Sequence, residues 1–336
     1  MNALVCVTGA SGFVGSAIVK ELLDHGYRVR GTARSPAGAL EHLRLLPGAD
    51  DRLEVVAADL EQPGSLDRAV AGCDYVVHAA SPYVLTVADT QRDLIDPAVR
   101  GTLEVLESSL AATTVRRVVV TSSLAAMTDE PEGTYDESHW NTSSSVTRNP
   151  YYFSKVSAES AAWEFASRNA FDLVTINPSL VIGPSLVPSL NVSNQVLADF
   201  TTRRYPGILD LGWGIVDIRD VAAAHRLALE VPSASGRYLC AADVWTMRQI
   251  VESVKNSDLG LARLPTLSLD NAWGRTLVRL AATFQPSGSR DFLRTNLGRR
   301  FRIDTTRIRS GLGMKFRSVE DSIVDAYRDL QRWGHI

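Results

Sequence analysis

The sequence predicts an α/β fold: a doubly wound parallel sheet with a smaller C-terminal lobe. Two observations carry this expectation. Short valine-rich runs alternate with amphipathic segments through the first half of the chain, which is typical of a parallel sheet with helices on both faces. After Asn177, prolines and glycines interrupt the alternation. We therefore predict a first domain over residues 1–177, with return elements at about 213–240, and a lobe made of 178–212 and 241–336.

The expected elements follow from the hydrophobic periodicity. Right-handed crossovers between such strands wind a sheet in both directions from its centre. Strands are expected at 3–7, 27–33, 53–57, 75–79, 117–121, 172–176 and 237–240, and helices at 14–24, 64–71, 91–110, 149–168, 220–230 and 318–333.

Composition excludes several classes of function. A formal net charge of −3 over 336 residues creates no strong field toward nucleic acid or a membrane surface. No run approaches the roughly 20 apolar residues of a membrane-spanning helix, and no basic leader precedes the first strand. Cys6, Cys73 and Cys240 are far apart in the sequence, so we expect buried free thiols and no metal site. A cytoplasmic protein, monomeric or homodimeric, is expected.

A glycine loop follows the first expected strand. Gly9, Gly12 and Gly15 are spaced three residues apart and open the first expected helix. In that context glycines permit a tight turn and a close approach of a dinucleotide pyrophosphate, which the helix N-terminus attracts. The sequence therefore predicts a Rossmann-type dinucleotide site. The residues expected at this loop are Thr8, Gly9, Ser11, Gly12, Phe13, Val14 and Gly15.

The end of the second strand indicates which dinucleotide is bound. An acidic residue there would hold the ribose hydroxyl of NAD, whereas an arginine favours the 2′-phosphate of NADP. No acid occurs between Asp24 and Glu41, and Arg34 stands where the strand should end. We therefore expect NADP(H). Asp59, after the third strand, is a weaker candidate for contact with the adenine, and its neighbour Leu60 is included with it.

Tyr151 and Lys155 form a candidate catalytic pair. A carbonyl reductase needs a proton donor, and a nearby ammonium can bring the tyrosine pKa down from about 10 toward neutrality. Residues four apart share a helix face, and Tyr151 is the only tyrosine with a lysine four positions on. Lysine is scarce, since Lys20, Lys155, Lys255 and Lys315 are the only ones among 35 basic residues.

A hydroxyl that polarises the substrate carbonyl should follow the strand at 117–121. The carboxyl ends of parallel strands face the crevice where ligands bind. Ser122 and Ser123 come directly after this strand and point to opposite faces if it continues. We choose Ser123, with Ser122 as the reserve, and expect Thr121 near the cofactor.

These motifs together resemble the extended short-chain dehydrogenase/reductase family. The nearest branch looks like the dihydroflavonol 4-reductase and cinnamoyl-CoA reductase group, with its microbial aldehyde and ketone reductases. The resemblance extends over nearly the whole chain, and its motifs are Thr-Ala-Arg34, His78-Ala-Ala-Ser-Pro, Val-Thr-Ser-Ser123, Tyr151-Tyr-Phe-Ser-Lys155, Asn177-Pro-Ser-Leu-Val-Ile-Gly-Pro, Val216-Asp-Ile-Arg-Asp-Val-Ala and Ser235-Gly-Arg-Tyr-Leu-Cys240.

The resemblance implies a catalytic Ser123, Tyr151 and Lys155 and a preference for NADPH. It also implies that the backbone of Pro178, Ser179, Leu180 and Val181, together with Ala79 and Ala80, contacts the nicotinamide side; Ser81 is expected beside them. Thr-Ala-Arg-Ser stands here where plant members often carry Thr-Val-Arg-Asp, and the residues after Ser123 are less polar than in the flavonoid enzymes. Dihydroflavonol is therefore not the expected substrate.

The remaining features concern the substrate. Expected pocket residues are Tyr83, Leu85, Met127, Leu186 and Tyr205. We interpret the arginines between 275 and 309 as the solvated face of a helix; the alternative is a handle for an anionic substrate, which would involve Arg299 and Arg300. His78 and His225 are expected to be structural.

The expected function is reversible reduction of a small-molecule aldehyde or ketone by NADPH. Two alternatives stay open. A sugar-nucleotide epimerase or dehydratase would keep NAD bound, but no acid follows the second strand. A non-catalytic NADP-binding regulator could share the fold, since function depends on the site.

Overall fold

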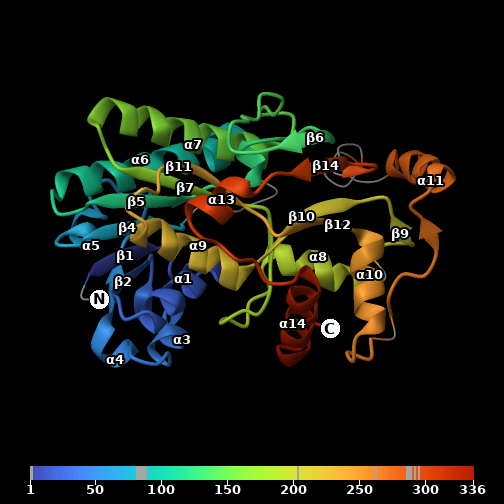
Figure 1. The fold of residues 1–336 in the computed structure, drawn as a ribbon, viewed down its shortest axis with the longest axis horizontal. Helices are drawn as coiled ribbons and strands as arrows, with labels where there is room; N and C mark the ends of the chain where they lie inside the picture. The colour runs from blue at the N-terminus through green and yellow to red at the C-terminus, as the bar shows by residue number, and fades with distance from the viewer. Residues whose placement is uncertain are drawn as a thin grey trace.

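The structure is a computed structural model, and it describes residues 3–80, 89–202, 204–261, 263–284 and 296–336, together with Arg290 and Leu293. A seven-stranded sheet lies at the centre, in the order β11-β7-β5-β4-β1-β2-β3. Neighbouring strands pair in parallel. From β1 the order runs outward in both directions, so the predicted doubly wound sheet is confirmed (Figure 1). The strands are β1 (Leu4–Thr8), β2 (Arg28–Ala33), β3 (Leu53–Ala57), β4 (Tyr75–His78), β5 (Arg117–Thr121), β7 (Leu173–Pro178) and β11 (Gly236–Cys240).

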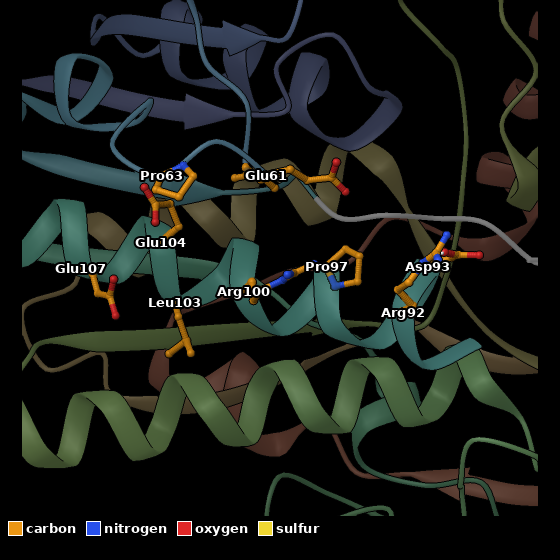
Figure 2. Close-up of a pocket in the computed structure, with 10 residues that line it drawn as sticks. Glu61, Pro63, Arg92, Asp93, Pro97, Arg100, Leu103, Glu104 and Glu107 are labelled. Atoms are coloured by element: carbon orange, nitrogen blue, oxygen red, sulfur yellow. The ribbon is translucent and has the colours of Figure 1, made fainter. Parts of the chain in front are cut away.

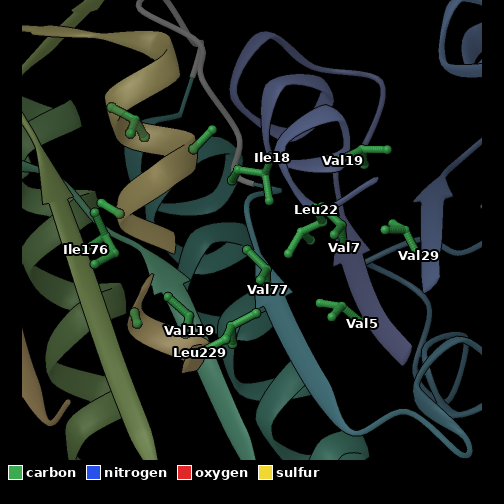
Figure 3. Close-up of a cluster of buried hydrophobic side chains, with 14 of the residues drawn as sticks. Val5, Val7, Ile18, Val19, Leu22, Val29, Val77, Val119, Ile176 and Leu229 are labelled. Carbon is green, nitrogen blue, oxygen red and sulfur yellow. The ribbon is translucent and has the colours of Figure 1, made fainter. Parts of the chain in front are cut away.

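Helices cover both faces of this sheet (Figure 1). Helices α1 (Phe13–Asp24) and α9 (Ile218–Glu230) pack against each other on one face, and α6 (Asp96–Ala111) and α7 (Pro150–Asn169) on the other. Side chains of a strand alternate between faces. Val5 and Val7 therefore join Leu22 of α1 in one core cluster (Figure 3), whereas Cys6 joins Val105 of α6 in another. Burial on both faces explains the unbroken apolar runs of these strands.

Short elements fill the connections of the first half. The predicted helix at 64–71 is reduced to the single turn of α5, and a π-helical turn, η1, precedes α6. These elements are α2 (Pro36–Ala39), α3 (Glu41–Arg44), α4 (Ala49–Arg52), α5 (Asp67–Val70), η1 (Gln91–Ile95) and η2 (Leu124–Ala126).

The C-terminal lobe has a core of its own. Its three-stranded sheet pairs β10 (Gly212–Asp217) with parallel β8 (Leu180–Ile182) and antiparallel β12 (Asp243–Thr246). Helix α14 (Val319–Arg332) packs against α8 (Val192–Thr201), α10 (Met247–Asn256) and β10. A second small pair joins β9 (Ile208–Leu209) to β13 (Ser268–Leu269), next to α11 (Ala272–Ala282). Within the described residues no helix is long and apolar enough to cross a membrane.

The chain passes twice from the large sheet into the lobe, once between β7 and β8 and once between β11 and β12. The two passages lie side by side, since the Ser179 amide donates to the Cys240 carbonyl at 3.1 Å. A further connection runs through β14 (Arg300–Ile303), which pairs in parallel with β6 (Glu132–Tyr135). Helix α13 (Thr306–Gly311) follows it and packs on β11. The division of the chain into domains by residue number stays a prediction.

Local sequence signals explain where two helices of the second half of the chain begin. The Asp217 carboxylate accepts the Arg219 amide at 2.8 Å at the start of α9. Thr246 and Gln249 form a reciprocal capping box at the start of α10. Both acceptors satisfy amides that the first helical turn leaves without a partner.

The solvated-helix interpretation of the arginine-rich stretch is wrong for Arg299, Arg300 and Arg302, whereas Arg307 and Arg309 lie exposed on helix α13. Arg275 and Arg279 lie on α11, and Arg279 is exposed. Arg300 begins β14, whose strand is held by backbone bonding to β6, and Arg299 before it is only 6% exposed. Clustered arginines do not reveal this, because the partner strand is more than 160 residues upstream in the sequence.

Candidate active site

The glycine loop connects β1 to α1 as predicted. Gly9 has φ +68°, a conformation that side chains rarely adopt, and a Cβ there would lie 2.7 Å from the Cα of Ala80. A Cβ on Gly15 would lie 2.1 Å from the carbonyl oxygen of Gly9. A Cβ on Gly12 would meet nothing closer than 3.4 Å, and Gly12 is exposed. Gly9 and Gly15 are therefore required by packing, whereas Gly12 leaves open the space in front of the helix.

The start of α1 suits a bound pyrophosphate. Gly12 is the N-cap residue, and no side chain caps the helix. No acidic residue lies in the first turn. The amides of this turn and the positive end of the helix dipole therefore face outward toward an anion. Thr8, Phe13 and Val14 flank this opening as expected, with Thr8 buried and the other two half-buried.

Arg34 follows β2 directly, at the predicted position. Its side chain is exposed and makes no hydrogen bond or ion pair with the described residues, so its charge is available to a ligand phosphate. Asp59 follows β3 by two residues, and its Oδ1 accepts the Glu61 amide at 3.0 Å. The carboxylate of Asp59 is thus partly committed to its own turn.

His78 and Thr8 fix the strand ends that border the cofactor site. The Thr8 hydroxyl lies 2.8 Å from Nδ1 of His78 and 3.3 Å from the Ala80 amide, which donates to it. Burial, with the charge of Lys155, lowers the His78 pKa to about 3. His78 is therefore neutral, and its Nδ1 shares one hydrogen bond with the Thr8 hydroxyl. Ala79 and Ala80 follow β4 as expected, whereas Ser81, Tyr83 and Leu85 lie outside the described residues.

Tyr151 and Lys155 occupy the first two turns of α7. The Lys155 ammonium lies 5.7 Å from the centre of the Tyr151 ring, so the predicted shared face is confirmed. Lys155 is 8% exposed. Burial lowers its pKa to about 8, and the charge of Glu159 acts in the opposite direction. A buried ammonium one turn from a tyrosine is suited to stabilising charge on the phenol oxygen.

Ser123 and Ser122 diverge after β5 as the alternation predicts. Ser123 Oγ accepts the Ala125 amide at 3.1 Å and caps the turn η2, against which α7 packs. Ser122 is buried, and its hydroxyl donates to Glu159 Oε2 at 2.5 Å. The hydroxyl of Ser122 is committed inside the protein, so Ser123 is the better candidate to meet a substrate.

Sequence reasoning missed a buried carboxylate beside Lys155, the candidate catalytic lysine. Glu159 is 1% exposed and lies one turn along α7 from Lys155. Arg237 Nε of β11 donates to Oε1 at 2.6 Å, and Asn177 Nδ2 of β7 donates to Oε2 at 2.7 Å. Thr175, Trp163 and Ser122 donate as well. The four-residue spacing from Lys155 was the only sequence signal that could have indicated Glu159.

Glu159 links the catalytic helix to three strands of the sheet. Asn177 Nδ2 also donates to the Ser123 carbonyl at 3.2 Å, so the same amide holds the serine turn. A cavity of about 20 Å³ lies between Lys155, Glu159, Ser122 and His78. That volume is enough for one water molecule. The network therefore fixes the position of Ser123 relative to Lys155.

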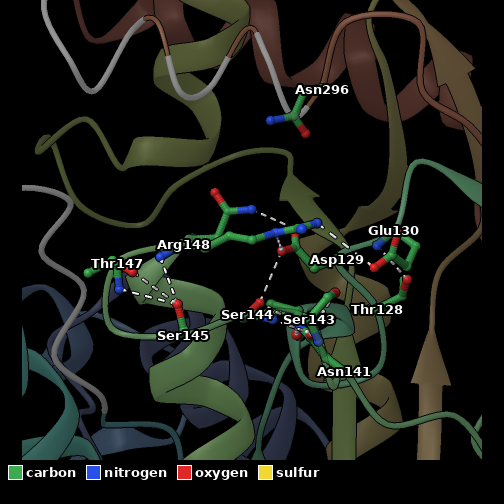
Figure 4. Close-up of polar contacts among 12 residues, drawn as sticks. Thr128, Asp129, Glu130, Asn141, Ser143, Ser144, Ser145, Thr147, Arg148 and Asn296 are labelled. Atoms are coloured by element: carbon green, nitrogen blue, oxygen red, sulfur yellow. Dashed lines mark hydrogen bonds and ion pairs between the residues drawn. The ribbon is translucent and has the colours of Figure 1, made fainter.

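A second buried carboxylate holds the approach to α7 (Figure 4). The side chain of Asp129 is fully buried and accepts from Arg148 Nε at 3.3 Å, Asn149 Nδ2 at 2.6 Å and Ser144 Oγ at 3.2 Å. Asn149 has φ +49° and begins the helix without a side-chain cap. Asp129 thus holds in place the residue from which the Tyr151 turn starts.

The expected residues after β7 lie next to the serine turn. Pro178 ends β7, and Leu180 and Val181 begin β8. The Ser179 Oγ is buried without a hydrogen-bond partner. A Cβ on Gly214 would lie 3.0 Å from the Cβ of Ser179 and 3.6 Å from Leu124. This close packing places the start of the lobe against the residue that follows Ser123.

The other expected residues are buried or partly buried. The Thr121 hydroxyl lies 2.7 Å from Nε2 of His225, whose Nδ1 donates to the Val221 carbonyl at 2.8 Å. Met127 is 1% exposed and belongs to a cluster with Leu124 and Phe301.

In the lobe, Tyr205 packs edge-on against Phe200, and burial raises the pKa of Tyr205 to about 12. Leu186 is half-buried. The assignment of Met127, Leu186 and Tyr205 to a substrate pocket stays a prediction.

A surface groove of about 710 Å³ lies between the loop after β3 and helix α6 (Figure 2). Its walls carry both signs of charge, for example Glu61 and Glu104 against Arg100. Leu60 is the only expected cofactor residue among those that line it. The groove contains none of the catalytic candidates, so it is not the active site.

Residues 5–241 match the family model described as "NAD dependent epimerase/dehydratase family". The chain belongs to this family. Its members include the extended short-chain dehydrogenases/reductases, so the resemblance that the motifs predicted is confirmed.

Named relatives of this family member are reductases. Cinnamoyl-CoA reductase 1 from Arabidopsis thaliana is 37% identical over 339 residues, covering 99% of this chain and 90% of that protein. The bifunctional dihydroflavonol 4-reductase/flavanone 4-reductase of Malus domestica is 38% identical over 75% of each chain. The solved structure of yeast methylglyoxal/isovaleraldehyde reductase Gre2 complexed with NADPH is 27% identical, with a TM-score of 0.80 over 99% of this chain and 100% of that one.

Proposed function

We propose that this protein is an NADPH-dependent reductase of a small aldehyde or ketone, acting reversibly on the alcohol. The observation that carries the proposal is the arrangement of Tyr151 and Lys155 on α7, beside the turn that Ser123 caps. The relatives named as reductases, and the Gre2 structure with NADPH, support the same reaction class.

The residues of the cofactor site fit a dinucleotide with a 2′-phosphate. The uncapped start of α1 and the open space at Gly12 suit the pyrophosphate. Arg34 offers an exposed guanidinium at the end of β2, with no acid beside it to hold a free ribose hydroxyl. When bound, NADPH supplies the hydride.

The chain supplies the proton and the positioning. Tyr151 donates the proton to the carbonyl oxygen, and Ser123 donates a hydrogen bond to the same oxygen. Lys155 binds ribose hydroxyls and stabilises the tyrosinate left after proton transfer. Through Asn177, Glu159 ties the Ser123 turn to α7, the helix that carries Lys155.

The test compares Tyr151→Phe with Tyr152→Phe. Both remove one hydroxyl from neighbouring residues of α7, but only Tyr151 has Lys155 on its face. We expect Tyr151→Phe to lower kcat by about 10²–10⁴-fold in NADPH oxidation against aldehydes, aryl ketones and β-keto esters. Tyr152→Phe should retain activity. A fully active Tyr151→Phe enzyme would remove the proposal.

The other candidate functions give different results in this assay. Stoichiometric NAD in the purified protein, without net turnover, would favour an epimerase or dehydratase. Tight NADPH binding with no turnover of any substrate, in wild type and variants alike, would favour a regulatory protein.

A further inference from the structure

Four arginines of the 275–309 stretch have hydrogen-bond or ion-pair partners elsewhere in the chain. Arg275 and Arg300 share the buried carboxylate of Asp210, at 2.7 and 2.5 Å. Arg307 donates to the Ser235 carbonyl at 2.8 Å, and Arg309 to the Thr305 hydroxyl at 3.0 Å. Each of these four guanidinium groups therefore has at least one hydrogen-bond acceptor in the folded chain.

Arg299 differs from its neighbours. It is 6% exposed, and its Nε and Nη2 are buried without any hydrogen-bond partner. Its Nη1 reaches Asn296 Oδ1 only at 3.5 Å, and the guanidinium stacks 4.5 Å from the centre of the Phe301 ring. Arg299 makes no ion pair within the described part of the chain. Since buried cations are normally paired, the described part of the chain leaves two donors of this guanidinium unsatisfied.

The two unsatisfied atoms define the shape of the missing partner. Nε and Nη2 form one edge of the guanidinium, which can donate two parallel bonds to one carboxylate. The same chain uses this edge elsewhere: Arg219 donates from Nε and Nη2 to Asp217 at 2.8 and 2.7 Å, and Arg248 to Asp270 at 2.6 Å from both atoms. In Arg299 this same edge has no hydrogen-bond acceptor among the residues that the structure describes.

Arg299 lies at the junction between the lobe and the catalytic turn. The ring beneath its guanidinium, Phe301, packs in one cluster with Leu124 and Met127, and Leu124 directly follows Ser123. Asn296, the weak partner of Arg299, lies above the network that holds the start of α7 (Figure 4). A group bound to Arg299 would therefore belong to a molecule that reaches toward Ser123.

We propose that Arg299 recognises an oxyanion of the substrate, a carboxylate or phosphate, through its Nε and Nη2. The natural substrate is then a carbonyl compound that carries an anionic group. This inference rests on the proposed reductase function and names its substrate class. It also separates Arg299 from Arg300, which Asp210 already neutralises.

Binding measurements test the site without depending on turnover. The NADP⁺-loaded protein is titrated by calorimetry with 4-formylbenzoate, 4-formylphenyl phosphate and the neutral methyl 4-formylbenzoate. We expect the wild type to bind one of the anions at least about 30-fold more tightly than the ester, since a desolvated charged pair is worth about 2 kcal/mol or more. The preferred anion identifies carboxylate or phosphate.

The variants are Arg299→Gln, Arg299→Lys and the control Arg302→Gln. Arg302 is exposed on β14, the strand that begins directly after Arg299, so its loss removes a charge without touching the buried edge. Arg299→Gln should abolish the preference and leave the ester unaffected, whereas Arg302→Gln should keep it. Arg299→Lys keeps the charge but not the fork, and should retain only part of the preference; it stands in if the glutamine variant fails to fold.

The outcomes separate the two proposals. Equal affinity of the wild type for anions and ester, or no binding of either anion, overturns the oxyanion site. An equal loss for anions and ester in Arg299→Gln does the same. NADPH-dependent reduction of the ester without any preference for anions would leave the reductase proposal standing. Tight, Arg299-dependent binding of an anion that is never reduced would contradict the reductase proposal instead.

Discussion

Replacing Glu159 with glutamine tests the network beneath the catalytic helix. Glutamine keeps the shape and one acceptor but removes the charge that faces the buried Arg237. Removing one partner of a buried pair costs about 3–5 kcal/mol. We expect the lower end, about 3 kcal/mol, because the Arg237 guanidinium also donates to the carbonyls of Glu137 and Ala126, at 3.1 and 3.4 Å. Unfolding entropy of roughly 0.7 kcal/mol/K for 336 residues converts this to a Tm lower by about 4 °C.

The same change should alter the pH dependence of activity. Burial lowers the pKa of Lys155 to about 8, and the charge of Glu159 opposes that effect. If the ammonium is the active form, kcat/KM of the wild type falls as pH rises past about 8. Without the Glu159 charge the lysine loses its proton more easily, so the alkaline decline should begin at a lower pH.

Glu164→Gln is the matched control for both measurements. Glu164 lies on the same helix and is exposed, and among the described residues its one ion pair is with Arg168, one turn on. Its loss should change stability by less than about 0.5 kcal/mol and leave the pH profile in place. Thermal unfolding and pH profiles of kcat/KM at saturating NADPH report the two effects. A Glu159→Gln protein with wild-type Tm, or with an alkaline decline that stays or moves upward, would refute the reasoning.

Three further predictions concern the cofactor site and acid stability. Gly15→Ala should destabilise the fold, because its Cβ would clash with the backbone, whereas Gly12→Ala should have the Tm of the wild type but bind NADPH more weakly. Thermal unfolding without cofactor and titration with NADPH measure the two effects. Equal behaviour of the two variants would contradict the assignment. Arg34→Gln should weaken NADPH binding by about 10-fold or more and leave NADH unchanged, as fluorescence titration would show; equal losses would remove Arg34 from the phosphate site. Burial lowers the pKa of His78 to about 3 and of His225 to about 4. Below about pH 6.5 the unfolded chain takes up protons that the folded chain does not, so the free energy of unfolding falls as the pH is lowered, by about 2 kcal/mol per histidine at pH 5. Urea unfolding at pH 7 and pH 5 measures this decrease. We expect a smaller decrease in His225→Gln.

Local patterns in the sequence were enough to predict the first half of the fold. Valine-rich strands and the glycine spacing are read from neighbouring residues, and β1, α1 and β2 begin and end within about three residues of expectation. The pairing of β14 with β6 was missed because it joins segments far apart in the chain. Nothing local distinguishes a strand that completes such a pair from a loop.

The candidate site shows the same division. Tyr151 and Lys155 are one helical turn apart, so their spacing alone predicted a shared face. Glu159 is a further turn along the same face, but its importance depends on donors from β7 and β11. Buried guanidinium donors without an acceptor, such as Nε and Nη2 of Arg299, are a property of the folded chain only.

The paired passages between the large sheet and the lobe have a mechanical consequence. The Ser179 amide donates to the Cys240 carbonyl, so the two short connections are joined to each other by their backbones. The chain also runs directly from β10 into α9 at Asp217 and Ile218, and β14 pairs with β6. A displacement of the lobe at one of these connections would therefore strain the others, and the position of the lobe relative to the Ser123 turn is set at several points of the chain.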